Sequence, residues 1–268
     1  MAEFDRRYAQ VGATTGTQTG VQVDEGLRSY MTSVYNYMCA GLVLTGLVAY
    51  YLFTMSTTGD ATLAAKSAAG IPIAMKRGEF LTPLGAFLYL SPFKWVLMFA
   101  PLAMSFALGM GMRSLGVAGA QVLFWAFAAV VGASMSTIFL VFKLGSIANV
   151  FFITSAAFAV LSLYGYTTKR SLSGVGTFLM MGVFGIIVAS LINIWVGSSM
   201  MQMIISAVGV LVFSALTAYN TQMIKDGYYE LVGDGSLLTK GAIDGALTLY
   251  VSFINLFTSL LNLFGDRE

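Results

Sequence analysis

The chain has 268 residues, of which 57% are apolar and only 10% are charged, whereas a soluble domain carries roughly 25% charged residues, so the composition indicates an integral membrane protein. The net charge of +2 is too small to indicate a nucleic-acid partner. The absence of histidine excludes Ser-His and Cys-His catalysis and imidazole metal sites, and we expect no enzyme, no metal site and no cofactor.

The N-terminal stretch 1–30 is polar and rich in Gly, Thr and Gln. It contains no apolar core of the kind found in a cleavable signal peptide. We predict a flexible cytoplasmic tail over 1–30, with a short amphipathic helix near 26–33, followed by a membrane domain over 31–268. The only cysteine, Cys39, lies in the first apolar segment, where we expect it to pack as a small hydrophobic side chain.

Seven apolar segments follow, each close to the ~20 residues that a helix needs to span a bilayer. Their predicted ranges are 34–53, 95–112, 116–141, 147–166, 176–196, 200–223 and 242–264. Only Gly197, Ser198 and Ser199 join the fifth segment to the sixth, which predicts an antiparallel pair. The predicted fold class is therefore an all-α integral membrane protein with seven transmembrane helices.

The connection over 54–94 differs from the other loops in its length. It begins with Ser, Thr and Ala residues and ends in an apolar stretch over 80–92 that contains two prolines and is too short to span. That last stretch is compatible with an interfacial or re-entrant piece, or with the start of the second span. We favour a long surface loop inserted between the first two spans.

Lysine and arginine in the loops predict the orientation, because cytoplasmic loops carry an excess of both. Seven spans place the two termini on opposite sides of the membrane. Eight basic residues then fall on the side of the N-terminus and two on the other side, or six if the 54–94 connection is counted. We predict a cytoplasmic N-terminus.

Acidic residues are missing from most of the predicted membrane region, since none occurs from Phe80 to Lys225. Proton-coupled carriers usually depend on buried carboxylates, and cation pores often present a ring of Asp or Glu. Neither arrangement is available in these spans. Only Asn, Gln, Ser, Thr, Tyr and backbone carbonyls could line a pore here.

A stripe of uncharged polar side chains follows the last segment. Its members are spaced by 3, 4 and 3 residues: Ser252, Asn255, Ser259 and Asn262. This spacing places them on one face of a helix, and that face must contact protein or water because hydrocarbon offers no hydrogen-bond partner. The sixth segment also carries polar groups, at Tyr219 and Asn220, so these two helices form the candidate functional centre.

Three separated motifs then suggest a family. They are SLYGYTTKR at 162–170, LTAYNTQ at 216–222, and GALTLY at 245–250 followed by FINLF at 253–257. With them the chain resembles the Bax inhibitor-1 family, also called TMBIM, and within it the bacterial YbhL-like branch. The resemblance covers nearly the whole chain except 54–94. It implies a seven-helix fold in the bacterial inner membrane, with the last helix central and surrounded by the other six.

The resemblance also implies a function. Members of the family are associated with calcium leak, with pH-dependent gating and with protection from stress-induced death, and some bacterial members with restraint of a membrane-bound AAA protease. The family's pH sensor is a pair of aspartates in the last two helices. This sequence departs from that pattern, because Asn220 and Ser252 stand at the two positions. Neither titrates, so the coupled titration of a carboxylate pair is lost.

Two functional hypotheses follow. The first is a calcium or cation leak channel with Asn220, Ser252, Asn255 and Tyr219 along its pathway or gate, in which pH gating is lost or weakened. The second is a non-conducting, stress-related regulator or scaffold that binds another membrane protein, such as an AAA protease. Asn220 and Ser252 are also compatible with ordinary interhelical hydrogen bonding, worth about 1–2 kcal/mol.

Overall fold

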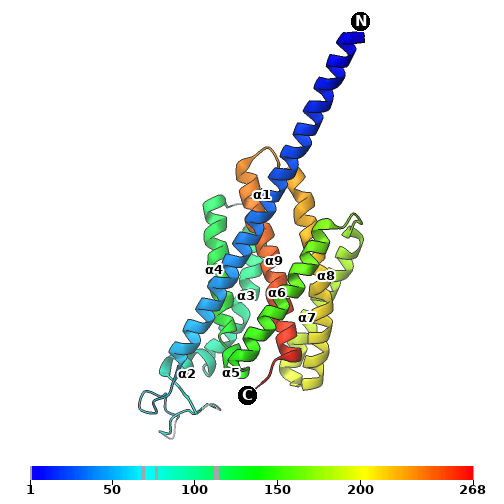
Figure 1. The fold of residues 1–268 in the computed structure, drawn as a ribbon. Coiled ribbons are helices and arrows are strands. Elements are labelled where there is room, and N and C mark those ends of the chain that lie inside the picture. Colours follow the sequence, from blue (N-terminus) through cyan, green and yellow to red (C-terminus); the bar gives the residue numbers. More distant parts are fainter. Residues whose placement is uncertain (1, 68–69, 76–77, 112–114, 268) are drawn as a thin grey trace.

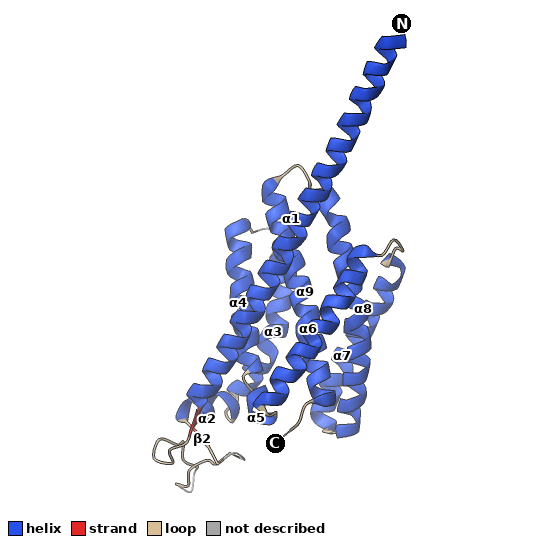
Figure 2. Cartoon of the chain, viewed as in Figure 1, coloured by secondary structure: helices blue, strands red, loops and turns tan. Residues whose placement is uncertain are grey.

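A computed structural model of the chain describes residues 2–67, 70–75, 78–111 and 115–267, with side chains described from Glu25 onward except at 106, 107 and 109–111. Two short strands, β1 (Thr57–Thr58) and β2 (Phe80–Leu81), pair antiparallel. All other regular elements are helices: α1 (Ala2–Ser56), α2 (Pro83–Tyr89), α3 (Phe93–Gly111), α4 (Val117–Met135), α5 (Ile138–Val141), α6 (Leu144–Thr167), α7 (Ser173–Val196), α8 (Ser199–Leu231) and α9 (Gly235–Phe264). The prediction of an all-α membrane bundle is confirmed (Figures 1 and 2).

Six helices of the described residues are long and apolar enough to cross a membrane, and a bent pair makes a seventh if it counts as one span. The pair consists of α2 and the first part of α3, which meet at an angle of 59°. Pro92 lies in the break between them and has no N–H to continue the helix, so the chain turns there. The apolar stretch over 80–92 is therefore largely a short helix set against the second span.

The connection over 54–94 is shorter than the surface loop that we favoured. At its start, α1 continues to Ser56. At its end, Pro83 occupies the first turn of α2 and the Thr82 hydroxyl caps that helix by accepting a hydrogen bond from Gly85 N at 3.2 Å. Between β1 and β2 the chain forms loops and turns over 59–79, of which residues 68–69 and 76–77 lie outside the description.

The first helix begins much earlier than its apolar segment. α1 starts at Ala2, so residues 2–30 of the stretch expected as a flexible tail are helical in the structure. Proline would have stopped it, and the first proline of the chain is Pro72. Flexibility of the stretch in solution remains a prediction.

The last helix occupies the centre of the bundle, as expected (Figure 1). It packs mainly against α8, α1, α6 and α4, while α3 lies on α4 and α7 lies on α8. Four helices rather than six therefore form its main surroundings. Ile243, Ala246 and Leu249 of α9 have no exposed surface. Because α9 is enclosed in this way, its polar stripe faces protein rather than lipid.

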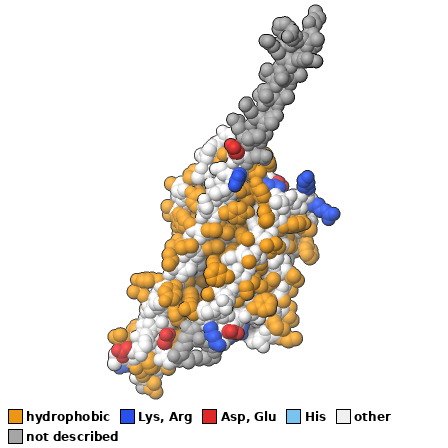
Figure 3. Space-filling view, in the orientation of Figure 1, with side chains coloured by type: hydrophobic (Ala, Val, Ile, Leu, Met, Phe, Trp, Pro, Cys, Tyr) orange, Lys and Arg blue, Asp and Glu red, His pale blue; other side chains and the backbone are white. Residues whose placement is uncertain are grey.

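The outside of the bundle is apolar. In the view of Figure 3, hydrophobic side chains cover the middle of the molecule, and charged side chains lie toward its two ends. Phe178 and Trp195 of α7 are 73% and 84% exposed. Large apolar side chains exposed in this way are rare on a water-soluble protein but are expected on a helix that faces lipid. Cys39, expected to pack as a small hydrophobic side chain, is exposed on α1.

The two ends of the described chain lie at opposite ends of the bundle (Figure 1). This arrangement fits an odd number of spans. The C-terminal residues after α9 return to the start of α6, where Lys143 N donates to Asp266 O at 3.0 Å and Asp266 N donates to Ser146 Oγ at 2.9 Å. α9 itself continues without a break over its 30 residues.

Candidate functional site

The two helices that bear the candidate residues form the most extensive helix contact of the bundle. Between them, Asn220 Nδ2 of α8 donates a hydrogen bond to Ser252 Oγ of α9 at 3.0 Å. The Ser252 hydroxyl in turn donates to Thr248 O at 3.0 Å. Ser252 is buried and Asn220 is half-buried. The two positions that the resemblance placed opposite each other are thus in direct contact, and the contact is neutral.

The rest of the polar stripe bonds mostly within its own helix. Asn255 Nδ2 donates to Val251 O at 2.8 Å, and Asn262 Nδ2 donates to Thr258 O at 2.9 Å. Ser259 lies against α8 at Gly209, where an added Cβ would approach its hydroxyl oxygen to 2.5 Å. Ser252 and Ser259 therefore face α8, whereas the Asn255 amide bonds to the α9 backbone rather than to Asn220 or Ser252. The spacing predicted that the stripe shares one helix face, and the structure shows that α8 lies against it.

Tyr219 does not join the pair. Its ring packs against Gly176 of α7, where an added Cβ would lie 2.6 Å from the Tyr219 hydroxyl oxygen. A side chain at position 176 would therefore displace the ring. Tyr219 fixes the distance between α7 and α8 and lies away from the α8–α9 contact.

A chain of hydroxyl groups, which sequence reasoning missed, begins one residue after Asn220. Tyr35 OH lies 2.6 Å from Ser162 Oγ, and Ser162 Oγ lies 2.9 Å from Thr221 Oγ1. Thr221 donates its one hydroxyl proton to Thr217 O at 2.8 Å, so it must accept from Ser162. Ser162 in turn accepts from the Tyr35 hydroxyl. The chain joins α1, α6 and α8. Its members lie in or near the family motifs, but nothing in a single sequence shows that they pair.

Gln222 closes the turn between α6 and α7, a second role that the sequence did not reveal. Its Nε2 donates to Arg170 O at 2.9 Å, and its Oε1 accepts from Leu172 N at 2.7 Å. One turn further along α8, Lys225 Nζ donates to Tyr166 O at 3.0 Å. The end of α8 therefore holds the neighbouring turn by side-chain bonds to the backbone.

The chemistry of the site follows from these contacts. Among the described residues, no group of three or more Cys, Asp or Glu is arranged to hold a metal ion. Two cavities, of about 1110 and 370 Å³, do not reach the expected gate, since Asn220, Ser252, Asn255 and Tyr219 line neither of them. The site is a closed, neutral contact between α8 and α9. Opening it breaks one interhelical hydrogen bond, worth about 0.6–1.7 kcal/mol in a membrane.

Comparison with known proteins decides the family. The family model described as "Inhibitor of apoptosis-promoting Bax1" matches residues 27–268, which is the whole membrane bundle. The chain belongs to the Bax inhibitor family. The resemblance seen in the three motifs is thereby confirmed.

Relatives of this Bax inhibitor family member occur in several bacteria. The inner membrane protein YbhL of Escherichia coli is 40% identical over 249 residues, which cover 92% of this chain and 96% of YbhL. A protein of Caulobacter vibrioides is 38% identical over the full length of both chains. A protein of Rickettsia prowazekii is also 38% identical, over 95% of this chain and 96% of its own.

Proposed function

We propose that this Bax inhibitor family protein is a cation leak pathway of the bacterial inner membrane, with calcium as the candidate ion, whose flux does not respond to pH. The observation that supports this most directly is the 3.0 Å hydrogen bond between Asn220 and Ser252. It stands where a titrating aspartate pair is expected from the family. Two carboxylates share a proton, and the interaction between them changes when that proton is lost. The hydrogen bond between an amide and a hydroxyl does not change in this way with pH.

The membrane location and orientation are part of the proposal. The printed name of the E. coli relative, an inner membrane protein, supports the location. Basic residues at the end of the bundle nearest the N-terminus support a cytoplasmic N-terminus, because positive loops stay inside. They include Lys169 and Arg170 in the α6–α7 turn and Lys225 near the end of α8. The proposed role is not catalytic, since a chain without histidine lacks the usual base for a nucleophile.

Calcium flux into proteoliposomes at pH 6 and pH 8 tests the proposal. We expect equal flux at both pH values in the natural chain. The double substitution Asn220→Asp with Ser252→Asp should make the flux depend on pH, because it restores two interacting carboxyl groups. A matched control is Asn193→Asp with Gln202→Glu, since Asn193 Nδ2 also donates to Gln202 Oε1 across two helices, at 3.2 Å.

The outcomes separate the alternatives. A flux of the Asn220→Asp, Ser252→Asp variant that is the same at pH 6 and pH 8 would show that these positions are not a pH sensor. A pH-dependent flux in the natural chain would place the sensor elsewhere. If the Asn193→Asp, Gln202→Glu control gains the same pH dependence, added charge rather than its place would be the cause.

A second candidate function is a non-conducting regulator or scaffold that binds another membrane protein, such as an AAA protease. It is supported by the way in which the polar stripe is satisfied within the chain, with Asn255 and Asn262 bonded to the backbone of α9. Polar side chains that are bonded in this way do not need an ion to satisfy them. The absence of flux at both pH values, in the natural chain and in the Asn220→Asp, Ser252→Asp variant, would favour this role over a leak.

A further inference from the structure

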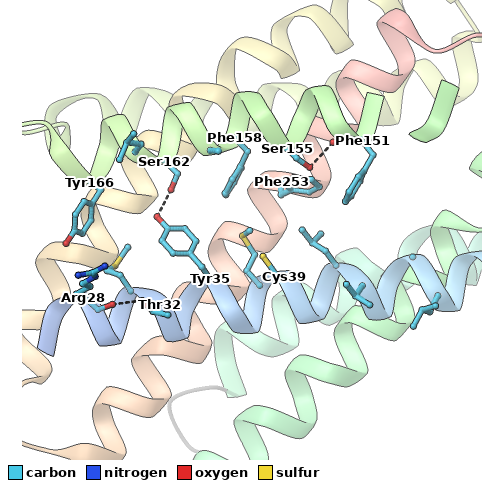
Figure 4. A pocket seen from close by; sticks show the side chains of 18 residues that line it. Arg28, Thr32, Tyr35, Cys39, Phe151, Ser155, Phe158, Ser162, Tyr166 and Phe253 are labelled. Carbon is cyan, nitrogen blue, oxygen red and sulfur yellow. Dashed lines mark hydrogen bonds between the residues drawn. The ribbon is translucent and has the colours of Figure 1, made fainter. Parts of the chain in front are cut away.

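A long groove of about 1110 Å³ lies between α1 and α6 (Figure 4). α1 forms one wall, α6 forms the other, and Phe253 of α9 lies at the floor. Both walls pack against α9, and the Tyr35–Ser162 hydrogen bond links one wall to the other. Val43 and Leu163, which line the groove, are each 61% exposed, so the groove opens sideways toward the bilayer.

The walls of the groove offer almost no free hydrogen-bonding groups. The hydroxyl of Ser155 donates to Phe151 O at 2.8 Å, and that of Thr32 donates to Arg28 O at 2.8 Å. The hydroxyls of Tyr35 and Ser162 bond to each other, and the Tyr166 hydroxyl lies at the Arg28 end of the groove. An ordered water needs two to four polar partners, and an ion needs more. The groove therefore suits hydrocarbon.

One end of the groove carries Arg28, the one charged residue among those that line it. Arg28 of α1 is exposed there and lies across from Tyr166 of α6 (Figure 4). Lys225 lies 5.9 Å from the centre of the Tyr166 ring and uses one of its donors on Tyr166 O. Among the described side chains, neither cation pairs with a carboxylate. Two cations beside an apolar groove complement a phosphate that is attached to a hydrocarbon chain.

The length of the groove fits an acyl chain. Arg28 and Leu47, the first and last residues of α1 that line it, are roughly 28 Å apart along a helix axis. From Arg28 to Cys39 the axial distance is about 16 Å, or half of the ~30 Å hydrocarbon core, which is the depth of one leaflet.

We propose that this groove binds an anionic glycerophospholipid from the leaflet at the Arg28 end. One acyl chain lies between α1 and α6 as far as Cys39, and the phosphate is held by Arg28 and Lys225. The bound lipid fills the space that separates α1 from α6 and so completes the packing around α9. This binding is independent of whether the α8–α9 contact conducts ions.

Cys39 provides the reporter for the test, because it lines the groove and is the only cysteine of the chain. A bimane fluorophore on Cys39 is followed in phosphatidylcholine vesicles that contain either brominated phosphatidylglycerol or brominated phosphatidylcholine. We expect the anionic lipid to quench at a mole fraction lower by a factor on the order of ten, since each cation near the surface favours anionic lipid. The double substitution Arg28→Gln with Lys225→Gln should remove that preference.

The control reporter is Phe184→Cys in a Cys39→Ser chain. Phe184 is 69% exposed on α7 and lies eleven residues from the start of that helix, a depth similar to that of Cys39. There the two brominated lipids should quench equally. As a measurement without a label, native mass spectrometry should show phosphatidylglycerol retained by the natural chain and lost from an Ala159→Phe variant, in which the added ring fills the groove.

Three results would overturn the proposal. The first is equal quenching of Cys39 by both lipids. The second is a preference that persists in the Arg28→Gln, Lys225→Gln chain, because the phosphate would then not lie at these cations. The third is the absence of quenching by either lipid together with Cys39-to-Cys39 crosslinks, which would assign the groove to a second copy of the chain.

Discussion

Gly165 of α6 determines how closely two helices of the bundle approach. A Cβ at this position would collide with the backbone carbonyl oxygen of Ala218 in α8. Backbone atoms cannot rotate out of the way as a side chain can. Ser162 lies one turn earlier on α6, and its 2.9 Å bond to Thr221 depends on the same close approach.

Gly165→Ala should therefore destabilise the protein by about 1–3 kcal/mol, the usual cost of overpacking a tight contact. The expected result is a lower midpoint of unfolding in detergent micelles, followed by circular dichroism. Gly185→Ala in α7 is the control, because a Cβ there meets nothing within 4 Å. Equal midpoints for the two variants would contradict the close contact of α6 with α8.

At the scale of the element, α9 begins at a side-chain cap. Asp234 Oδ1 accepts hydrogen bonds from Ser236 N at 2.8 Å and from Leu237 N at 3.2 Å, and also from the Ser236 hydroxyl. The Ser236 hydroxyl, followed by the two backbone N–H groups, holds the pKa of Asp234 below its usual value. The carboxylate form is thus the one that caps the helix.

This cap predicts a pH dependence with a definite sign. Because the folded pKa is lowered, the stabilisation is present above the ordinary pKa of aspartate and is lost as the pH falls through the lowered value. Asp234→Asn should keep the cap without the titration, since asparagine also caps helices, whereas Asp234→Ala should lose it at every pH.

Amide hydrogen exchange over 235–240, corrected for the intrinsic rates, measures this difference. At neutral pH the natural chain and Asp234→Asn should be protected alike, and in acid only the asparagine variant should stay protected. If the natural chain kept its protection in acid, the carboxylate would not be the capping group.

On the scale of the whole molecule, Tyr250 joins the central helix to two of its neighbours. Its hydroxyl lies 2.6 Å from Thr45 Oγ1 of α1, and Thr45 donates to Ala128 O of α4 at 3.0 Å. The Tyr250 ring also meets Phe124 and Phe127 of α4 edge to face, at centroid distances of 6.2 and 5.8 Å. One side chain thus links three spans.

Tyr250→Phe should lower the free energy of unfolding by about 0.6–1.7 kcal/mol, since it removes one buried hydrogen bond and keeps the ring. Tyr250→Ala should cost several times more, because it also removes the ring contacts and leaves a cavity of the kind that costs about 3–5 kcal/mol. Tyr164→Phe is the control, on a tyrosine that is 52% exposed on α6. Unfolding midpoints in denaturant test this ranking, and a Tyr250→Phe midpoint equal to that of Tyr164→Phe would rule out the link.

Local sequence by itself determined the class of protein, the order of the apolar segments and the family. Each of these depends on short stretches: about twenty apolar residues form one span whatever surrounds them, and a motif such as LTAYNTQ can be recognised alone. The spacing of Ser252, Asn255, Ser259 and Asn262 likewise predicted one helix face, because helical periodicity is local.

Only the tertiary structure decided which of these residues meet. Tyr35 and Ser162 are separated by 127 positions along the chain, and no local periodicity links them. Asn255 was expected in the gate but bonds to its own helix, and the α1–α6 groove exists because both helices pack on α9 with little contact between them. The physical reason is that hydropathy places a helix in the bilayer, whereas its rotation and its neighbours follow from the packing of side chains contributed by the whole chain.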